Sequence, residues 1–237
     1  MKVLSIVHQP DAGAGVFGEA AGELVEWVPA QGPPPELDGV GAAMVFGGAM
    51  DTHEEQTHPW LRAEKDFLRS LLARGLPVLG VCLGSQLLAE AAGARPRLAA
   101  RPEIGWQRVE VLRDGVSDPL LGPLAPAFEV FAWHSYEAPL PPRAVALACT
   151  PVCLQAFRLT DAPAWGLQFH AEVSPENLNS WLDGWREDPD AVDSGLDPEA
   201  IRAASRARIG AQAELGRALA ERFMAEATAV TGQAAIR

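Results

Sequence analysis

A cysteine stands between two glycines in the stretch "PVLGVCLGSQLLAE", which covers residues 77–90. Residues 77–81 form a short apolar run typical of a buried strand, and a helical pattern begins near Gly84. Cys82 is therefore predicted in a tight turn at the carboxyl end of a parallel strand, where open α/β sheets place their sites. Gly80 and Gly84 allow a sharp turn, and the helix N-terminus stabilises a thiolate and a developing oxyanion. The stretch predicts a nucleophilic cysteine.

A base and an orienting carboxylate for this cysteine occur in "WGLQFHAEV", residues 165–173. If residues 165–170 form a strand, His170 and Glu172 point to the same side. Glu172 can then bind one imidazole nitrogen while the other nitrogen faces the thiol. Cys82, His170 and Glu172 are therefore predicted to be a Cys-His-Glu triad, which only the fold can bring together.

The other two cysteines, Cys149 and Cys153, are interpreted as small apolar core residues, because neither lies beside a plausible base in the sequence. Three cysteines cannot all pair within one chain, and a disulfide scaffold needs a denser, even set. We therefore expect reduced thiols.

Three further motifs resemble cofactor or metal sites but depart from the spacing that such sites require. "GAGVFG", residues 13–18, matches a dinucleotide fingerprint but begins too far from the first strand. His53 and His58 in "HEEQTH" are five apart, so they do not share a helical face as zinc ligands would. "PVC" and "HAE" resemble the two motifs of zinc deaminases, but they occur in the reverse order along the chain. The second cysteine that those enzymes have three places after the first is also missing. We expect no organic cofactor and no metal.

Length and composition favour an α/β domain with a substantial core, since the chain has 237 residues and is 48% hydrophobic. Its 19 Lys and Arg against 31 Asp and Glu give a net charge of −12, which argues against a nucleic-acid partner. The apolar run in "MKVLSIVHQP" is too short for a signal peptide, and no stretch approaches the ~18 apolar residues of a membrane span. We expect a cytoplasmic protein with no membrane partner.

Apolar runs alternate with helical patterns in the first half of the chain. The strand candidates there are residues 2–7, 24–28, 42–48 and 77–81, with a crossover helix over 58–75 that ends at Gly75. This order predicts a mostly parallel sheet covered by helices. In the second half, "QRVEVL", "AVALAC", "CLQAFRL" and "AWGLQFH" are short strand candidates that favour antiparallel additions at one edge.

The last quarter of the chain is predicted to be mostly helical. A helix begins after Ser174, a good N-cap, with Pro175 at its first position. Residues 186–198 are predicted to be an acidic surface loop, and an alanine-rich pattern predicts a long helix from Glu199 to about Ala225. We expect this acidic loop and C-terminal helical extension, residues 188–237, to have a structural role or to form a homo-oligomer.

The motifs "GVCLGSQ", "QFHAEV", "VFGG" and "EIGW" together resemble the class I glutamine amidotransferases, in particular free-standing GMP synthase-like members. The resemblance covers residues 1–187, which we expect to form the amidotransferase domain. It implies a flavodoxin-like α/β sheet with helices on both faces. It also implies hydrolysis of the side-chain amide of glutamine to glutamate and ammonia through a cysteinyl thioester. By motif, Cys82 is the nucleophile, His170 the general base and acid, and Glu172 the orienting carboxylate.

The same resemblance implies residues that bind the substrate. Gly47 and Gly48 match the family's oxyanion strand, with the backbone N–H of Leu83 as a second donor. The side chains at positions that hold glutamine in this family are Gln86, Trp133, His134 and Ser135. Ala171 stands where the family usually has a proline, which would fix that backbone in advance.

Two other functions stay open at this point. The same triad with a roomier pocket would hydrolyse γ-glutamyl amides other than glutamine. A catalytically idle relative would bind a partner or metabolite, although it has no physical reason to keep a strained, oxidisable nucleophile. The chain contains no G-x-x-x-x-G-K loop, so a synthetase that accepts the ammonia is expected to be a separate protein.

Overall fold

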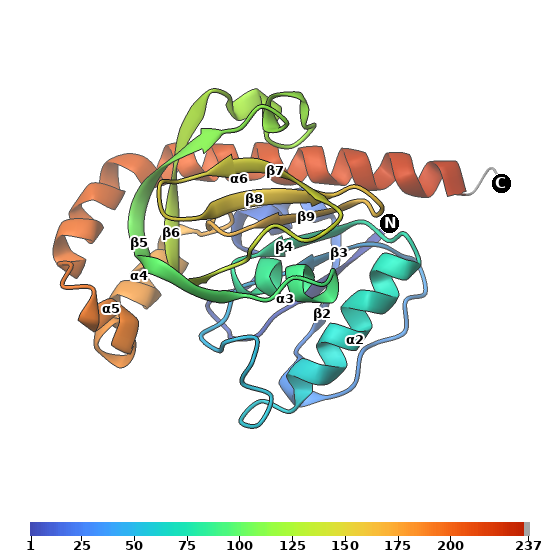
Figure 1. The fold of residues 1–237 in the computed structure, drawn as a ribbon, viewed down its shortest axis with the longest axis horizontal. Coiled ribbons are helices and arrows are strands. Elements are labelled where there is room, and N and C mark those ends of the chain that lie inside the picture. The colour runs from blue at the N-terminus through green and yellow to red at the C-terminus, as the bar shows by residue number, and fades with distance from the viewer. Residues whose placement is uncertain (235–237) are drawn as a thin grey trace.

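The computed structural model describes residues 1–234 and builds them around a nine-stranded sheet (Figure 1). Five neighbouring strands are parallel. In spatial order they are β2 (Glu23–Trp27), β1 (Lys2–Ile6), β3 (Val40–Val45), β4 (Val78–Val81) and β9 (Ala164–Leu167). The order 2-1-3-4 is that of flavodoxin-like sheets, with β9 in the fifth place. The predicted mostly parallel sheet is confirmed.

Four antiparallel strands extend the sheet beyond β9, as predicted for one edge. They are β8 (Leu154–Leu159), β7 (Ala144–Cys149), β5 (Arg97–Val111) and β6 (Ala127–Glu137). The strand β6 was not predicted, because Val130, Phe131 and Ala132 are buried in succession and break the two-residue alternation of a strand. Together, β5 and β6 form a long curved ribbon at one end of the sheet (Figure 1).

Alternating side chains divide the parallel strands between two apolar cores, one on each face of the sheet. Val3 and Met44 belong to one core, while their neighbours Leu4 and Val45 belong to the other. The long helix α6 covers the first face, and α2 and α3 cover the second (Figure 1). These helices are α2 (Trp60–Ala73), α3 (Leu83–Ala91) and α6 (Pro198–Ala234). Helices on both faces are therefore confirmed.

The last quarter of the chain departs from the prediction in its acidic segment. The helix α4 (Pro175–Asp183) begins as predicted after Ser174, whose hydroxyl accepts a hydrogen bond from Asn177 N at 3.2 Å. The predicted acidic loop over 186–198 was wrong, because it contains α5 (Pro189–Asp193). Asp188 caps this helix by accepting from Ala191 N, so its charge completes a helix end. The helix α6 also continues well beyond its predicted end, since its apolar residues pack along the sheet.

Short helical turns complete the fold. They are η1 (Gly15–Phe17), α1 (Gly18–Ala21), η2 (Pro29–Gln31), η3 (Gly115–Ser117), η4 (Gly122–Leu124) and η5 (Trp185–Glu187). Within residues 1–234, no helix combines the length and the apolar character needed to cross a membrane.

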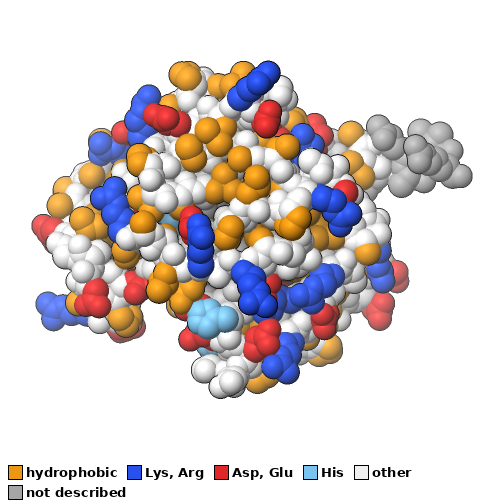
Figure 2. All heavy atoms as spheres, in the orientation of Figure 1, with side chains coloured by type: hydrophobic (Ala, Val, Ile, Leu, Met, Phe, Trp, Pro, Cys, Tyr) orange, Lys and Arg blue, Asp and Glu red, His pale blue; other side chains and the backbone are white. Residues whose placement is uncertain are grey.

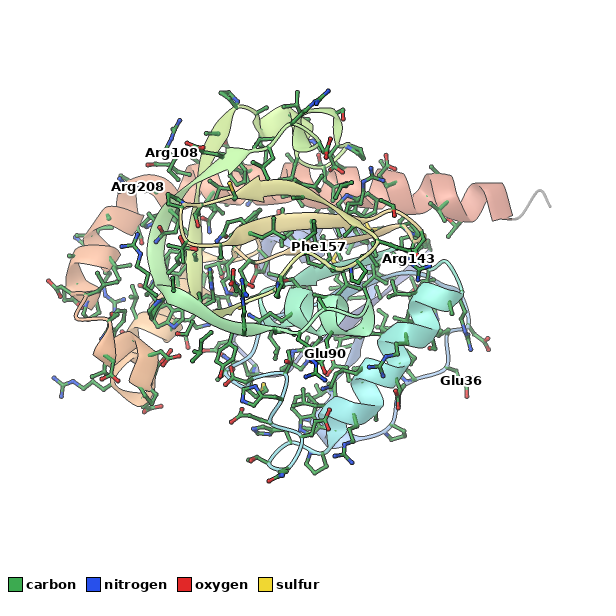
Figure 3. All side chains as sticks on the ribbon, in the orientation of Figure 1. Glu36, Glu90, Arg108, Arg143, Phe157 and Arg208 are labelled. Carbon is green, nitrogen blue, oxygen red and sulfur yellow. The ribbon has the colours of Figure 1, made fainter. Side chains whose placement is uncertain are left out.

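Packing in the second core depends on a close approach between β8 and β9. Phe157, labelled in Figure 3, is buried, and a Cβ on Gly166 would collide with its ring.

On the face of the molecule shown in Figure 2, acidic and basic side chains are interspersed among apolar ones. That face therefore does not carry the single-sign stripe typical of a nucleic-acid-binding surface.

Candidate active site

Cys82 lies in the turn between β4 and α3 and has a strained backbone. Its φ of 52° is the only positive value for a non-glycine residue in the described chain. A Cβ on Gly80 would lie 2.5 Å from the carbonyl oxygen of Gly84, and a Cβ on Gly84 would collide with the carbonyl oxygen of Val45. The two glycines therefore let the strand and the helix approach closely. The turn holds the thiol at the N-terminus of α3, as expected of a nucleophile elbow.

His170 and Glu172 follow β9, which pairs with β4, so the two segments reach the same edge of the sheet. Both side chains are buried, and His170 Nδ1 lies 2.7 Å from Glu172 Oε1. Because Nδ1 contacts Glu172, Nε2 is the ring nitrogen that is available to exchange a proton with the Cys82 thiol. Burial alone would lower the pKa of His170, but the charges on Glu172 and Cys82 outweigh it and raise that pKa to about 10. The arrangement favours a protonated His170 ring at neutral pH.

Gly47 and Gly48 follow β3 and pass close to this pair. A Cβ on Gly47 would lie 3.1 Å from His170 Cε1, and a Cβ on Gly48 would lie 3.0 Å from the Leu83 side chain. Within residues 1–234, the backbone N–H groups of Gly48 and Leu83 have no acceptor. Both groups are therefore available to bind an oxyanion beside Cys82.

A buried ion pair, which the sequence pattern did not predict, supports the segment that carries these glycines. His8 Nε2 lies 2.9 and 3.1 Å from the two carboxylate oxygens of Glu64, and Nδ1 lies 3.1 Å from the carbonyl oxygens of both Phe46 and Gly47. A protonated ring, which donates from both nitrogens, satisfies the carboxylate and the two carbonyls together. Burial opposes this charge, but Glu64 and the two carbonyls raise the pKa of His8. The available sequence signal was a glutamate at position 64 on the helical stripe of Leu61, Leu68 and Leu71.

The C-terminal helix also reaches the site, through a glutamine that was not predicted there. Gln212 Oε1 accepts from Phe131 N at 2.7 Å, and its Nε2 donates to the carbonyl oxygen of His170 at 3.1 Å. A Cβ on Gly216 would collide with the carbonyl oxygen of Ala171, so α6 packs directly on the segment that holds His170. A glutamine within an alanine-rich helix has no distinctive spacing, and no sequence pattern marked this contact.

The site opens into a cavity of about 590 Å³, a size suited to a small molecule. Its walls include Cys82 and His170 and, from the predicted substrate-binding set, Gly48, Leu83, Gln86, Trp133, His134 and Ser135. Gly47 and Glu172 lie behind these walls. The carbonyl oxygen of Trp133 is 3.7 Å from Cys82 Sγ, and Gln86 Nε2 donates to the carbonyl oxygen of Tyr136 at 3.2 Å. The fold therefore gathers the predicted residues around one cavity.

The rim of the cavity is acidic. Its carboxylates are Asp11, Asp51, Glu187, Asp188 and Asp190, and the described residues that line the cavity include no lysine or arginine. Asp188 also accepts a hydrogen bond from Trp133 Nε1 at 2.7 Å, which ties η5 and α5 to the cavity wall. This contribution from beyond residue 187 was not predicted, because these acidic residues have the composition of a solvated loop.

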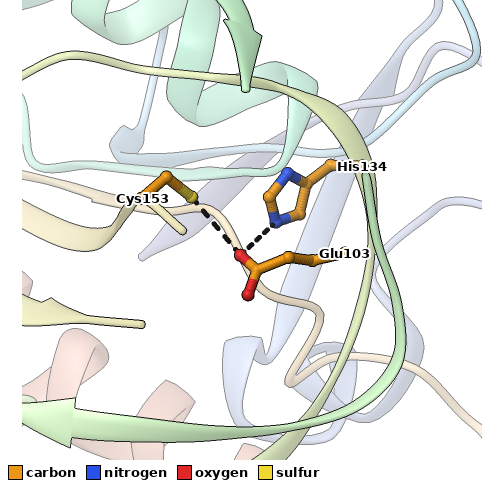
Figure 4. Close-up of side chains that lie close together, drawn as sticks. All are labelled: Glu103, His134 and Cys153. Carbon is orange, nitrogen blue, oxygen red and sulfur yellow. Dashed lines mark hydrogen bonds and ion pairs between the residues drawn. The ribbon is translucent and has the colours of Figure 1, made fainter. Parts of the chain in front are cut away.

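The structure also places the glycine-rich stretch 13–18 and Cys153, which the sequence did not assign to the site. In the glycine-rich stretch 13–18, Val16 N donates to the carbonyl oxygen of Glu172 at 2.9 Å, so this stretch supports the candidate triad. The prediction that Cys153 has no base beside it was wrong, because its Sγ lies 3.4 Å from Glu103 Oε2, near His134 (Figure 4). Cys153 and Glu103 are 50 positions apart and meet through the arrangement of the strands, which spacing along the chain does not show.

Comparison with known proteins agrees with this fold and site. The family model "Glutamine amidotransferase class-I" matches residues 19–182. The glutamine amidotransferase-like protein YfeJ of Salmonella typhimurium is 29% identical over 191 residues, which cover 77% of this chain and 80% of YfeJ. A glutamine-hydrolyzing GMP synthase subunit of Natronomonas pharaonis is 35% identical over 144 residues, 60% of this chain and 71% of the Natronomonas protein. The chain belongs to the class I glutamine amidotransferase family.

A solved structure extends the likeness to the whole fold. The crystal structure of a glutamine amidotransferase from Thermotoga maritima has a TM-score of 0.83 with this chain at 27% sequence identity. The match covers 94% of this chain and 97% of the Thermotoga chain, so it includes the C-terminal helix region as well as the sheet.

Proposed function

We propose that the protein hydrolyses the side-chain amide of glutamine to glutamate and ammonia, with Cys82, His170 and Glu172 as its catalytic triad. The observation that carries this proposal is the buried His170–Glu172 pair beside the strained Cys82 turn, where both meet one cavity. Glutamine as the amide is supported by the relatives, since one of them is a glutamine-hydrolyzing GMP synthase component.

In the first half of the proposed reaction, the Cys82 thiolate attacks the amide carbon and forms a carbon–sulfur bond. The electron pair of the carbonyl moves onto its oxygen, which the N–H groups of Gly48 and Leu83 stabilise. His170 then gives its proton to the amide nitrogen, the carbon–nitrogen bond breaks, and ammonia leaves. Glu172 holds the ring orientation and stabilises the imidazolium before that transfer.

In the second half, the thioester is hydrolysed. His170, now neutral, takes a proton from a water molecule whose oxygen attacks the thioester carbon. The carbon–sulfur bond breaks, glutamate leaves, and the imidazolium–thiolate pair is restored. Gln86, Trp133, His134 and Ser135 are proposed to form the wall that holds the glutamyl part of the substrate.

A second candidate function is hydrolysis of γ-glutamyl amides larger than glutamine. Two observations favour it, the cavity of about 590 Å³ and its five carboxylates without a lysine or arginine. A carboxylate rim attracts a positively charged group. The favoured alternative substrates are therefore γ-glutamyl amides whose leaving amine also carries a separate cationic group.

The ammonia released from glutamine is proposed to pass to a separate synthetase, since the relatives include an amidotransferase-like protein and one component of a synthase. Residues 1–187 are proposed to form the amidotransferase domain, and residues 188–237 an extension that supports it. Consistent with that support, Leu219 and Phe223 of α6 are fully buried against the sheet. Deletion after Arg186 is therefore expected to unfold the protein.

The test is release of glutamate by the purified chain from glutamine and from a panel of γ-glutamyl amides with neutral and cationic amines. We expect release that is abolished in Cys82→Ala, retained in Cys149→Ala, and unchanged by ATP, because no step of the mechanism uses a nucleotide. Release that survives in Cys82→Ala would contradict the mechanism. No release from any substrate would favour an idle relative or one that needs its partner.

A further inference from the structure

A second group of cysteine, histidine and glutamate lies outside the candidate triad. Glu103 on β5, His134 on β6 and Cys153 just before β8 place one ligand atom each within 4.8 Å of the others (Figure 4). All three side chains are buried, with exposed fractions of 3%, 5% and 7%. Thiolate sulfur, imidazole nitrogen and carboxylate oxygen are the three ligand types of protein zinc sites.

The buried Nε2 of His134 faces the carboxylate of Glu103. Its Nδ1 lies 3.0 Å from the carbonyl oxygen of Tyr136, so Nδ1 donates a hydrogen bond and Nε2 is the ring nitrogen that can bind a cation. Nε2 lies 3.4 Å from Glu103 Oε2, yet within the described chain this buried atom has no hydrogen-bond partner. A cation bound by both Nε2 and this carboxylate would satisfy the buried nitrogen.

The distances match those between ligands of one metal ion. A charge-assisted hydrogen bond between nitrogen and a carboxylate oxygen is about 2.7–2.9 Å long, which is shorter than the 3.4 Å between His134 Nε2 and Glu103 Oε2. Ligands of one tetrahedral zinc ion, with bonds of about 2.0–2.3 Å, lie about 3.3–3.5 Å apart and point at the ion. The Nε2–Oε2 and Sγ–Oε2 separations are both 3.4 Å.

The surroundings have the hydrogen bonds that orient metal ligands. The Tyr136 carbonyl fixes the ring of His134, which is the usual arrangement for a ligating histidine. Glu103 Oε2 accepts from Gln155 Nε2 at 2.7 Å and from Thr150 Oγ1 at 3.1 Å, so its carboxylate is held in place. His134 also lines the cavity, which offers an entry path.

We propose that Glu103, His134 and Cys153 form a zinc site, independent of the candidate triad, that fastens β5, β6 and the segment before β8 behind the wall of the cavity. On binding, Cys153 releases its thiol proton to water, and Zn²⁺ gains bonds to Sγ, to His134 Nε2 and to a carboxylate oxygen of Glu103. The fourth position is left for a water or another ligand. The ion holds the β6 segment whose carbonyl groups contact Cys82 and Gln86.

The test uses the full chain in a Cys82→Ala background, which removes the competing thiol–imidazole pair of the triad. The protein is treated with a chelator, desalted under reducing conditions and dialysed against buffered Zn²⁺, and bound zinc is measured by mass spectrometry. We expect one zinc per chain. Cys153→Ala and Glu103→Gln in this background should each weaken binding about 100-fold or more, while the matched control Cys149→Ala should bind as before.

A second measurement keeps the test decisive if a cluster variant fails to fold. With Co²⁺ in place of Zn²⁺, the Cys82→Ala protein should show a thiolate-to-cobalt charge-transfer band and the strong visible absorption of a tetrahedral ion. No stoichiometric zinc, a cobalt spectrum without the thiolate band, or full zinc binding in a folded Cys153→Ala variant would overturn the proposal. None of these readouts depends on amide hydrolysis, so the proposed function stands or fails separately.

Discussion

The protein contains the same three residue types in two clusters, and the order in which they touch differs. In the cluster of Cys82, His170 and Glu172, the histidine lies between the thiol and the carboxylate. In the cluster of Glu103, His134 and Cys153, the carboxylate lies between the other two (Figure 4). The thiol therefore lies beside the histidine in the first cluster and beside the carboxylate in the second.

The difference shows in the direction of the pKa shifts. In the first cluster, the charges of Glu172 and Cys82 overcome burial and raise the pKa of His170, which favours a proton on the ring. In the second, burial and the neighbouring charge of Glu103 both raise the pKa of the Cys153 thiol, which favours a proton on sulfur. In the proposed mechanism a histidine between the two activates the thiol of Cys82, whereas the carboxylate between His134 and Cys153 favours a proton on sulfur.

The largest expected difference between the clusters is in turnover after loss of each carboxylate. Glu172→Gln should lower kcat about 10²- to 10⁴-fold, because the ring of His170 loses its orientation and its charge stabilisation. Glu103→Gln should lower kcat by less than about tenfold, because Glu103 contacts neither His170 nor Cys82. Steady-state kinetics of both variants check this, with circular dichroism to confirm folding. Equal losses in the two variants would remove Glu172 from the triad.

Thiol reactivity should separate the clusters next. At pH 7 we expect iodoacetamide to modify Cys82 about 100-fold faster than Cys153, since the thiolate at a helix N-terminus beside an imidazolium is the reactive form. Burial also raises the pKa of Cys149, which should react slowly as well. Peptide mapping over time measures the three rates, and the urea-unfolded chain, in which they should become similar, is the control. A Cys149 or Cys153 that reacts as fast as Cys82 would contradict the elbow interpretation.

The pH profile should sharpen the assignment of His170. The proposed mechanism requires its protonated ring, so kcat/KM of the wild type should fall on the alkaline side near the His170 pKa of about 10. Loss of the Glu172 charge lowers that pKa, so in Glu172→Gln the alkaline fall should move to lower pH by about one to three units. Cys149→Ala serves as the matched control with an unmoved profile. An identical alkaline limb in Glu172→Gln would assign it to another group.

The last prediction concerns stability rather than turnover. It tests a third histidine–carboxylate pair, His8 and Glu64, which has no thiol beside it. Glu64→Gln leaves a buried charge unpaired and should lower the free energy of unfolding by about 3–5 kcal/mol at neutral pH. The pKa of His8 is raised on folding, so its contribution to stability is complete below its unfolded value, near pH 6.5, and is lost as pH rises through the folded value. Urea unfolding at several pH values should therefore show a flatter pH dependence in Glu64→Gln than in the wild type. Parallel curves would mean that His8 is neutral.

Features that depend on short stretches of chain were determined by the sequence alone. The glycines around Cys82 and the two-residue spacing of His170 and Glu172 are local patterns, because backbone conformation and strand periodicity act over a few residues. The Ser174 cap and the alternation of strands and helices in the first half are of the same kind. These patterns were sufficient to predict the α/β fold and to name Cys82, His170 and Glu172, whereas the other predicted residues of the cavity came from the resemblance to the family.

Only the tertiary structure decided which distant residues share an environment. Gln212 reaches His170 from α6, and Asp188 reaches Trp133 from the cap of α5. Glu103, His134 and Cys153 come together because β5, β6 and the turn before β8 converge. Burial then sets the charge on each group, since desolvation and the nearest partner act through space and leave no mark on sequence spacing. For this reason Cys153 looked like an inert core residue in the sequence and became a candidate metal ligand in the fold.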